Sequence, residues 1–277
     1  MSTSSESALD SINFSGGIPS SADLAPSIIF TILYVASVPL LVWRLMRGHS
    51  PILLMIRPCI FVLVRIGTLI LRAVMSKNSF GEGELIAELV LVSIGYLFLI
   101  DPVVGLWNLH VDTAVPRDQR PSWVKRLASL MRIGLLAAIG TAIAGSALVS
   151  SALTDGSNLS TVIDLRRASA IISLAVIGIT GLAIIQTHLR FGLDARRTGY
   201  LLIPTVCLLI VAIYRVVQVF STDPNATIRK LPAFWVLQIT FEFLAYVCFI
   251  AININEWFPG APKTEDVEMA RSAQYKA

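Results

Sequence analysis

The sequence predicts an all-α polytopic membrane protein, a bundle of seven transmembrane helices with its N-terminus outside and its C-terminus in the cytoplasm. Seven apolar stretches each have close to the roughly 20 residues that a helix needs to cross a hydrocarbon core. Composition agrees, because 55% of the 277 residues are hydrophobic, only 14% are charged, and the mean hydropathy is +0.73. This leaves too little polar surface for a water-soluble domain of this length.

The predicted elements follow one another in a simple order. A Ser-rich tail of residues 1–26 is expected to be disordered and extracellular or lumenal. The membrane domain of residues 27–254 comes next, and a mixed-charge cytoplasmic tail of residues 255–277 ends the chain. The expected helices cover 27–46, 52–75, 85–107, 127–149, 168–189, 200–220 and 233–254. Kinks are expected in four of them, at Pro39, Pro58, Pro102 and Pro204.

The charges between the helices predict the orientation. The first 26 residues contain three acids and no Lys or Arg, whereas Arg44 and Arg47 directly follow the first helix. In this topology the inner connectors carry nine Lys and Arg residues and the outer ones five, which agrees with the positive-inside rule. The net charge of +4 is therefore topogenic, and since the basic residues form no patch, nucleic-acid binding is not expected.

Three Asn-x-Ser/Thr sequons support the same orientation. They begin at Asn13, Asn158 and Asn225, in the N-terminal tail, the fourth-to-fifth connector and the sixth-to-seventh connector. All three lie on the outer side of the expected topology. The sequence therefore predicts a glycoprotein of the plasma membrane or of another membrane of the secretory pathway.

Ionisable side chains inside the apolar spans are the candidate site. They are Arg65, Arg72, Glu88, Asp101, Arg215 and Glu242. Each is costly in lipid and is expected to face the bundle interior. We expect Glu88 to pair with Arg72 at similar depth. Glu242 is expected to pair with Arg65 or Arg215, which leaves one guanidinium for an anionic or carbonyl-bearing head group. The alternative is that these charges only satisfy one another and fix helix register.

The last two spans carry a resemblance. Residues 213–218, which read Ile-Tyr-Arg-Val-Val-Gln, and residues 235–246 resemble fungal lipid-translocating exporter-like proteins, which have seven helices and an outside N-terminus. Members of that family show an aromatic-Arg pair followed by Glu, and an acidic pair seven residues apart on the last helix. Tyr214-Arg215 matches the aromatic-Arg pair and Glu242 the second acid.

Two positions depart from this family pattern, because Gln218 and Trp235 stand where acids are expected. Residues 57–66 are more similar to fungal seven-helix families of unassigned function. The resemblance implies a fungal membrane protein that handles lipids, hydrophobic toxins or secondary metabolites. We therefore expect it to bind, translocate or confer tolerance to an amphipathic lipid or a hydrophobic secondary metabolite, with no cofactor.

An enzyme of secondary metabolism is the main alternative. Small membrane terpene cyclases of fungi begin carbocation chemistry by protonating an epoxide or alkene, and Glu88, Asp101 or Glu242 could supply that proton. The neighbouring arginines oppose this, because guanidinium groups hold carboxylates in the ionised form.

Other classes of seven-helix protein require particular residues at particular positions. A retinal protein needs a Schiff-base lysine in the last helix, and residues 233–254 contain none. A rhodopsin-type receptor is not expected either, since the third span ends in Trp-Asn-Leu-His, although another receptor or a structural protein stays open. His49, His110 and His188 lie near inner helix ends but lack a His-x-x-x-His spacing, so no metal is expected.

Overall fold

The computed structural model describes residues 15–47, 52–115, 120–154, 158–221, 223 and 226–259. Within these ranges every regular element is a helix and there is no β-strand. Seven helical segments are long and apolar enough to cross a membrane. The predicted all-α architecture with seven spans is therefore confirmed for the described chain, which is a multi-pass integral membrane protein.

The spans follow one another in chain order. The first two are α2 (Leu24–Met46) and α3 (Ile52–Met75). The third consists of α4 (Glu82–Gly95) and α5 (Leu97–Ala114), and the next three are α6 (Ser122–Ala147), α8 (Leu159–Phe191) and α9 (Ala195–Phe220). The seventh is built from α10 (Leu231–Ala233), the π-helical η3 (Phe234–Thr240) and α11 (Phe241–Ala251). The remaining short helices are η1 (Ser21–Asp23), α7 (Val149–Thr154), η2 (Thr227–Arg229) and α12 (Ile254–Trp257).

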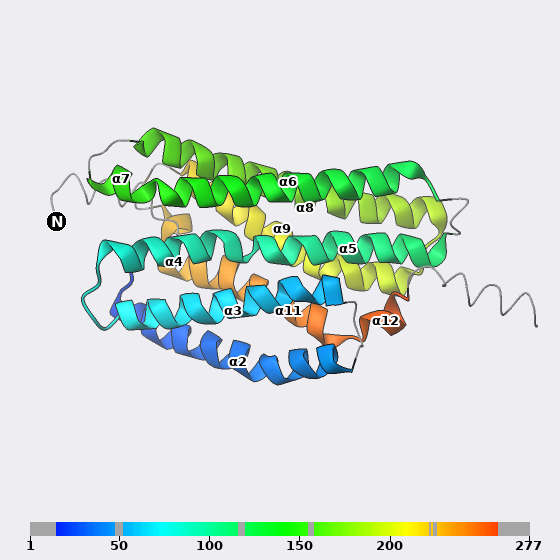
Figure 1. The fold of residues 1–277 in the computed structure, drawn as a ribbon, viewed down its shortest axis with the longest axis horizontal. Coiled ribbons are helices and arrows are strands. Elements are labelled where there is room, and N and C mark those ends of the chain that lie inside the picture. The colour runs from blue at the N-terminus through cyan, green and yellow to red at the C-terminus, as the bar shows by residue number, and fades with distance from the viewer. Residues whose placement is uncertain are drawn as a thin grey trace, which may run out of the picture.

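The spans lie side by side along the longest axis of the molecule (Figure 1). The start of α2 and the short α12 lie at opposite ends, as an odd number of spans requires; we call these the N-terminal and C-terminal ends of the bundle. The third span is the most buried and the first the least, so α4 and α5 form the centre and α2 an edge. Arg44 of α2 ties this edge down by donating to the carbonyls of Ile250 and Ala251 at the end of α11.

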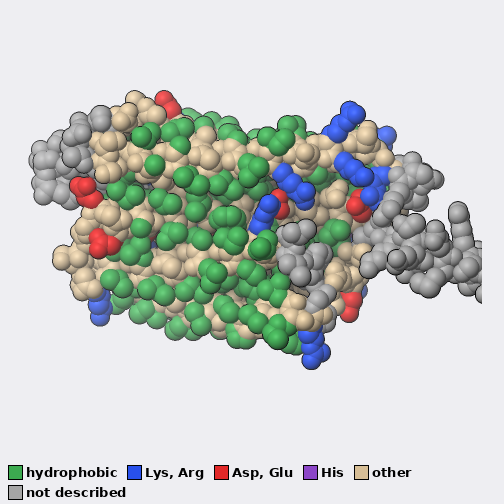
Figure 2. All heavy atoms as spheres, viewed as in Figure 1, with side chains coloured by type: hydrophobic (Ala, Val, Ile, Leu, Met, Phe, Trp, Pro, Cys, Tyr) green, Lys and Arg blue, Asp and Glu red, His purple; other side chains and the backbone are tan. Residues whose placement is uncertain are grey.

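The outer surface of the bundle is apolar. Large hydrophobic side chains on α2, α6 and α8 are exposed, among them Ile32, Leu136 and Leu182. Figure 2 shows that such side chains cover most of the visible face between the two ends. A surface of this kind is stable against lipid and not against water.

Small residues let α6 and α8 approach closely. A Cβ atom added to Gly134 would lie 3.2 Å from Cγ2 of Val176, so the glycine makes room for that side chain. Ser169 donates from α8 to the carbonyl of Ala138 on α6 at 2.8 Å. Close backbone approach and interhelical hydrogen bonds are what stabilise helix pairs in lipid.

Several predicted helix bounds differ from the observed ones, by up to nine residues, and the segment before the first span also differs from its prediction. Residues 15–23, expected in a disordered tail, have a defined conformation, and α2 begins at Leu24. The fifth span begins at Leu159 rather than at residue 168, and its 33 residues reach about 50 Å. Hydropathy marks the apolar middle of a helix, whereas its polar ends continue the same backbone hydrogen bonding beyond the hydrocarbon core.

Candidate functional site

Two spans lose regular α-helical structure within the membrane. In the third span, α4 ends at Gly95 and Tyr96 separates it from α5. In the seventh span, η3 is a π-helix of seven residues. Irregular backbone at membrane depth must find hydrogen-bond partners inside the protein, and π-helical turns occur frequently at functional sites. Charged side chains gather near both irregular segments.

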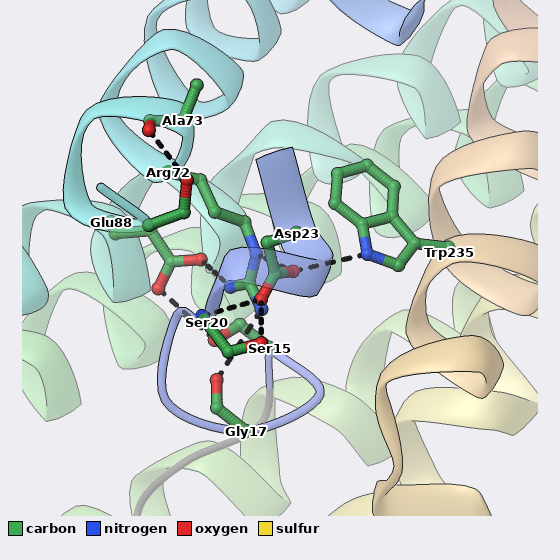
Figure 3. A network of polar contacts seen from close by, with 9 residues as sticks. Ser15, Gly17, Ser20, Asp23, Arg72, Ala73, Glu88 and Trp235 are labelled. Atoms are coloured by element: carbon green, nitrogen blue, oxygen red, sulfur yellow. Dashed lines mark hydrogen bonds and ion pairs between the residues drawn. The ribbon is translucent and has the colours of Figure 1, made fainter. Parts of the chain in front are cut away.

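The first group, which we call the Arg72 cluster, consists of Ser15, Asp23, Arg72, Glu88 and Trp235 (Figure 3). Arg72 donates from Nε to Asp23 Oδ1 at 2.7 Å and from Nη1 to Glu88 Oε1 at 2.6 Å. The same Asp23 oxygen accepts from Trp235 Nε1 at 3.2 Å, and Ser15 donates to Glu88 Oε2 at 3.2 Å. Both ion pairs are fully buried, with 0% exposed side chains.

The chain before α2 folds back to build this cluster. Gly16 and Gly17 have φ angles of 84° and 110°, a backbone region that favours glycine. A Cβ atom on Gly16 would lie 2.7 Å from Cβ of Phe234, so only glycine fits against the seventh span there. Asp23 also accepts from the backbone N–H of Ser20 at 2.9 Å. The segment 15–23 thus closes the N-terminal end of the bundle over Arg72 (Figure 3).

The second group lies deeper, and we call it the Arg65 cluster: Arg65, Val92, Arg215, Gln238 and Glu242. Arg65 Nη2 lies 2.5 Å from Glu242 Oε2, and both side chains are fully buried. At this distance the two groups form an ion pair. Arg215 donates to the carbonyl of Val92 at 3.1 Å, and Arg65 reaches the same carbonyl at 3.5 Å. The two arginines therefore share one backbone acceptor.

The break in the third span explains this shared carbonyl. In a continuous helix, the N–H of Tyr96 would donate to the carbonyl of Val92, but here it donates to Ile94. The freed carbonyl then accepts from the guanidinium groups of α3 and α9. Arg215 also lies over the Tyr96 ring, with its Cζ 4.6 Å from the ring centroid. The irregular backbone and the buried arginines thus stabilise each other.

Several polar atoms of the Arg65 cluster have no hydrogen-bond partner among the described residues. They are Nε and Nη1 of Arg65, both amide atoms of Gln238 and both carboxylate oxygens of Glu242. Gln238 is fully buried four residues before Glu242, and its amide lies near that carboxylate. Buried groups of this kind are rare, because each costs about 1–3 kcal/mol when left unpaired. The cluster therefore contains both donors and acceptors that have no hydrogen-bond partner among the described residues.

Gly95 provides the space for the Arg65 guanidinium. A Cβ atom on Gly95 would lie 2.9 Å from Arg65 Cζ. We expect Gly95→Ala to push the guanidinium away from Val92 and to lower the free energy of unfolding by about 1–3 kcal/mol. Gly140→Ala is the matched control, because a Cβ atom there meets nothing within 4 Å, and it should leave thermal unfolding in detergent unchanged or slightly raised. Equal loss in both variants would contradict this role.

Asp101 forms a third, separate group nearer the C-terminal end. Its carboxylate contacts Arg57 of α3, and its other oxygen lies 3.3 Å from Nε of Arg132 of α6. Each of the three acids proposed as proton donors, Glu88, Asp101 and Glu242, thus lies within ion-pair distance of an arginine. A guanidinium group attracts the carboxylate form of each acid, which counts against acid-initiated chemistry.

Histidines near the C-terminal end contact a hydroxyl group. Thr198 Oγ1 lies 2.9 Å from Nε2 of His110 and 3.2 Å from Nδ1 of His188. Among the described residues, no three His, Cys, Asp or Glu side chains form a group that could hold a metal ion. His49 lies outside the described residues.

The sequence anticipated part of this arrangement. The pair of Glu88 with Arg72 is present, and of the two partners considered for Glu242 the structure selects Arg65. Asp23, Arg57 and Arg132 were missed as partners. Asp23 precedes the apolar stretch, so hydropathy gives no sign that it enters the bundle. Arg57 and Arg132 fall inside expected spans, and a complete count of charged residues in those spans would have found them.

The predicted glycosylation sites lie mostly beyond the described chain. Asn13 and Asn225 are outside the described residues. Asn158 is exposed and directly precedes α8, with a φ angle of 64° that asparagine tolerates better than most residues. Its use as an acceptor stays a prediction.

No protein-family model, curated protein or solved structure matches this sequence. The resemblance to fungal exporter-like proteins therefore stays a prediction from the residues of the last two spans.

Proposed function

We propose that this membrane protein binds the head group of an amphipathic lipid or a hydrophobic secondary metabolite at the Arg65 cluster, and that it moves this molecule or confers tolerance to it. In this proposal the N-terminus lies outside and the C-terminus in the cytoplasm, as the connector charges favour. The plasma membrane or another membrane of the secretory pathway is the proposed location.

The observation that carries the proposal is the set of unpartnered atoms on Arg65 and Gln238. A guanidinium group presents its N–H donors as a planar fork that suits carboxylate, phosphate and carbonyl oxygens. A primary amide adds one donor site and one acceptor site. A head group with an anionic or carbonyl oxygen and a hydroxyl would satisfy both side chains at once.

Position in the membrane supports the same ligand class. Charged residues inside transmembrane spans are rare and mark substrate or ion pathways in many membrane proteins. Discontinuous helices whose unwound carbonyls meet ligands are typical of transport proteins. Here the interrupted third span and the π-helical part of the seventh span both contribute to the Arg65 cluster. An amphiphile reaches such a site from the bilayer itself, without crossing water.

Gln238→Leu gives the sharpest test of this proposal. It removes two unpartnered polar atoms without breaking an ion pair, so a purely structural cluster should become more stable. A ligand site should lose function. We expect a strain that produces the variant to match a strain that lacks the protein in its lipid and metabolite profile and in its tolerance to a panel of amphiphiles.

The control is Lys77→Gln, which removes an exposed cation just after α3 and should keep the wild-type profile. The amount of each variant in the membrane is measured by immunoblot, so that loss of protein is not mistaken for loss of function. Wild-type profiles from the Gln238→Leu strain would refute the proposal. A new covalent product in microsomes would point to the enzyme alternative instead.

A further inference from the structure

Two arginines face the membrane near the C-terminal half of the bundle. The side chains of Arg57 on α3 and Arg132 on α6 are 36% and 52% exposed, whereas Asp101 between them on α5 is buried. Their neighbours Ile56, Ile133 and Leu136 are 49%, 61% and 65% exposed, so this side of the bundle faces lipid. Figure 2 shows basic and acidic side chains grouped within the hydrophobic face.

The charges of this group do not balance. Asp101 contacts both arginines, and it is the only acidic partner that the described residues give to either of them. One positive charge is therefore left beside the exposed apolar side chains of Ile56, Ile133 and Leu136. Arg57 lies about 8 Å along α3 from its first residue and Arg132 about 15 Å along α6, at a rise of 1.5 Å per residue. A bare guanidinium at such depth is costly, and this cost falls when the guanidinium reaches water or a lipid head group.

We propose that Arg57 and Arg132 together bind the phosphate of an anionic phospholipid on the membrane-facing side of α3, α5 and α6. Two guanidinium forks held at one carboxylate present several N–H donors to a single phosphate. Asp101 positions both forks and neutralises one of their charges. A lipid with a net negative charge neutralises the other, which a zwitterionic lipid does less well because its own cation competes.

The proposal stands apart from the Arg65 cluster, because it uses other residues and another face of the bundle. With the proposed orientation, Arg57 and Arg132 lie in the cytoplasmic half of the membrane, whose leaflet carries the anionic phospholipids. The bound lipid would be a resident component of the membrane and not the transported amphiphile.

Native mass spectrometry tests this site. The full-length protein is reconstituted in nanodiscs that contain equal amounts of phosphatidylcholine and phosphatidylserine, and the lipids that remain bound after release are counted. We expect the wild-type protein to retain phosphatidylserine in preference to phosphatidylcholine. Arg132→Gln should reduce this preference by roughly tenfold, the effect of losing one charge-assisted contact. Arg132→Lys keeps the charge but loses the planar guanidinium. Its preference for phosphatidylserine should lie between those of the wild-type protein and Arg132→Gln.

Arg126→Gln is the matched control, because Arg126 is also exposed on α6. It should keep the wild-type preference. Unchanged retention in Arg132→Gln, or equal retention of the two lipids by the wild-type protein, would overturn the proposal. Release of the lipid by excess inorganic phosphate would show recognition of free phosphate, and a lipid-free dimer would show that a second copy covers this face; either outcome also overturns it.

Discussion

Replacing Glu242 with alanine should lower the free energy of unfolding by about 3–5 kcal/mol, since it leaves a charged Arg65 buried without its counter-ion. Both side chains of this ion pair are fully buried, so water does not reach the guanidinium to replace the lost carboxylate. Arg215 raises the cost further, because it shares the Val92 carbonyl with Arg65. Thermal or denaturant unfolding of the purified protein in a mild detergent measures the loss. Glu82→Ala, which removes an exposed acid from the start of α4, is the control.

A double variant separates stability from function at the same position. Arg65→Met combined with Glu242→Leu removes both charges together and fills their place with apolar side chains of similar volume. Replacing a buried ion pair in this way is often neutral or stabilising by about 1–4 kcal/mol. We therefore expect the double variant to unfold closer to the wild-type midpoint than Glu242→Ala does, and yet to lack amphiphile handling. If it kept amphiphile handling, the ion pair would be a register device and the proposed function would fail.

The seven spans could be predicted because a single quantity, the hydropathy of each stretch of about 20 residues, determines them. A stretch of about 20 apolar residues has no stable place except in a bilayer or a large core, and the composition excludes the large core. The depth of charged residues along their helices also predicted the pairing of Glu88 with Arg72. Both lie near the same end of adjacent spans, and they form an ion pair in the structure. These inferences use only position along a helix axis, which the sequence carries directly.

The sequence does not predict the break of the third span at Tyr96. Gly95 and Pro102 both weaken the third span, yet neither says where the helix stops. The position is set by tertiary contacts, since the freed Val92 carbonyl is stabilised by arginines from two other helices. The same holds for Asp23, whose place in the bundle depends on a backbone reversal before α2 and on an indole from the last span. Contacts between distant segments are what hydropathy leaves out.

The two buried clusters differ in net charge and in how fully their polar groups are hydrogen-bonded. The Arg72 cluster contains one cation and two carboxylates, and its guanidinium is bonded on two sides. The Arg65 cluster contains two cations and one carboxylate, and it holds unpartnered donors. A well-satisfied group of this kind favours structure, whereas an under-satisfied group with surplus positive charge favours a ligand. We therefore propose that the first cluster closes the N-terminal end and that the second binds the ligand.

Arg72→Ala should be at least as damaging as Glu242→Ala, with a loss of about 3–5 kcal/mol, because it strands two buried carboxylates instead of one cation. The carboxylates of Asp23 and Glu88 both lie within 2.7 Å of Arg72 nitrogens, so without the guanidinium they repel each other at short range. We also expect the segment 15–23 to detach from the seventh span, since Asp23 is its main polar contact there. Hydrogen exchange of residues 15–23 would report that release separately from global unfolding.

Neutralising the stranded acids should reverse most of the damage from Arg72→Ala. We expect the triple variant with Asp23→Asn and Glu88→Gln to regain most of the lost stability, because amides carry no charge to repel and the amide oxygen introduced at position 23 can still accept from the Trp235 indole. Lys77→Gln serves as the control, since it removes a cation from the same end of α3 at an exposed position. A triple variant as unstable as Arg72→Ala would mean that packing of the long arginine side chain against Phe234, and not its charge, holds this end of the bundle together.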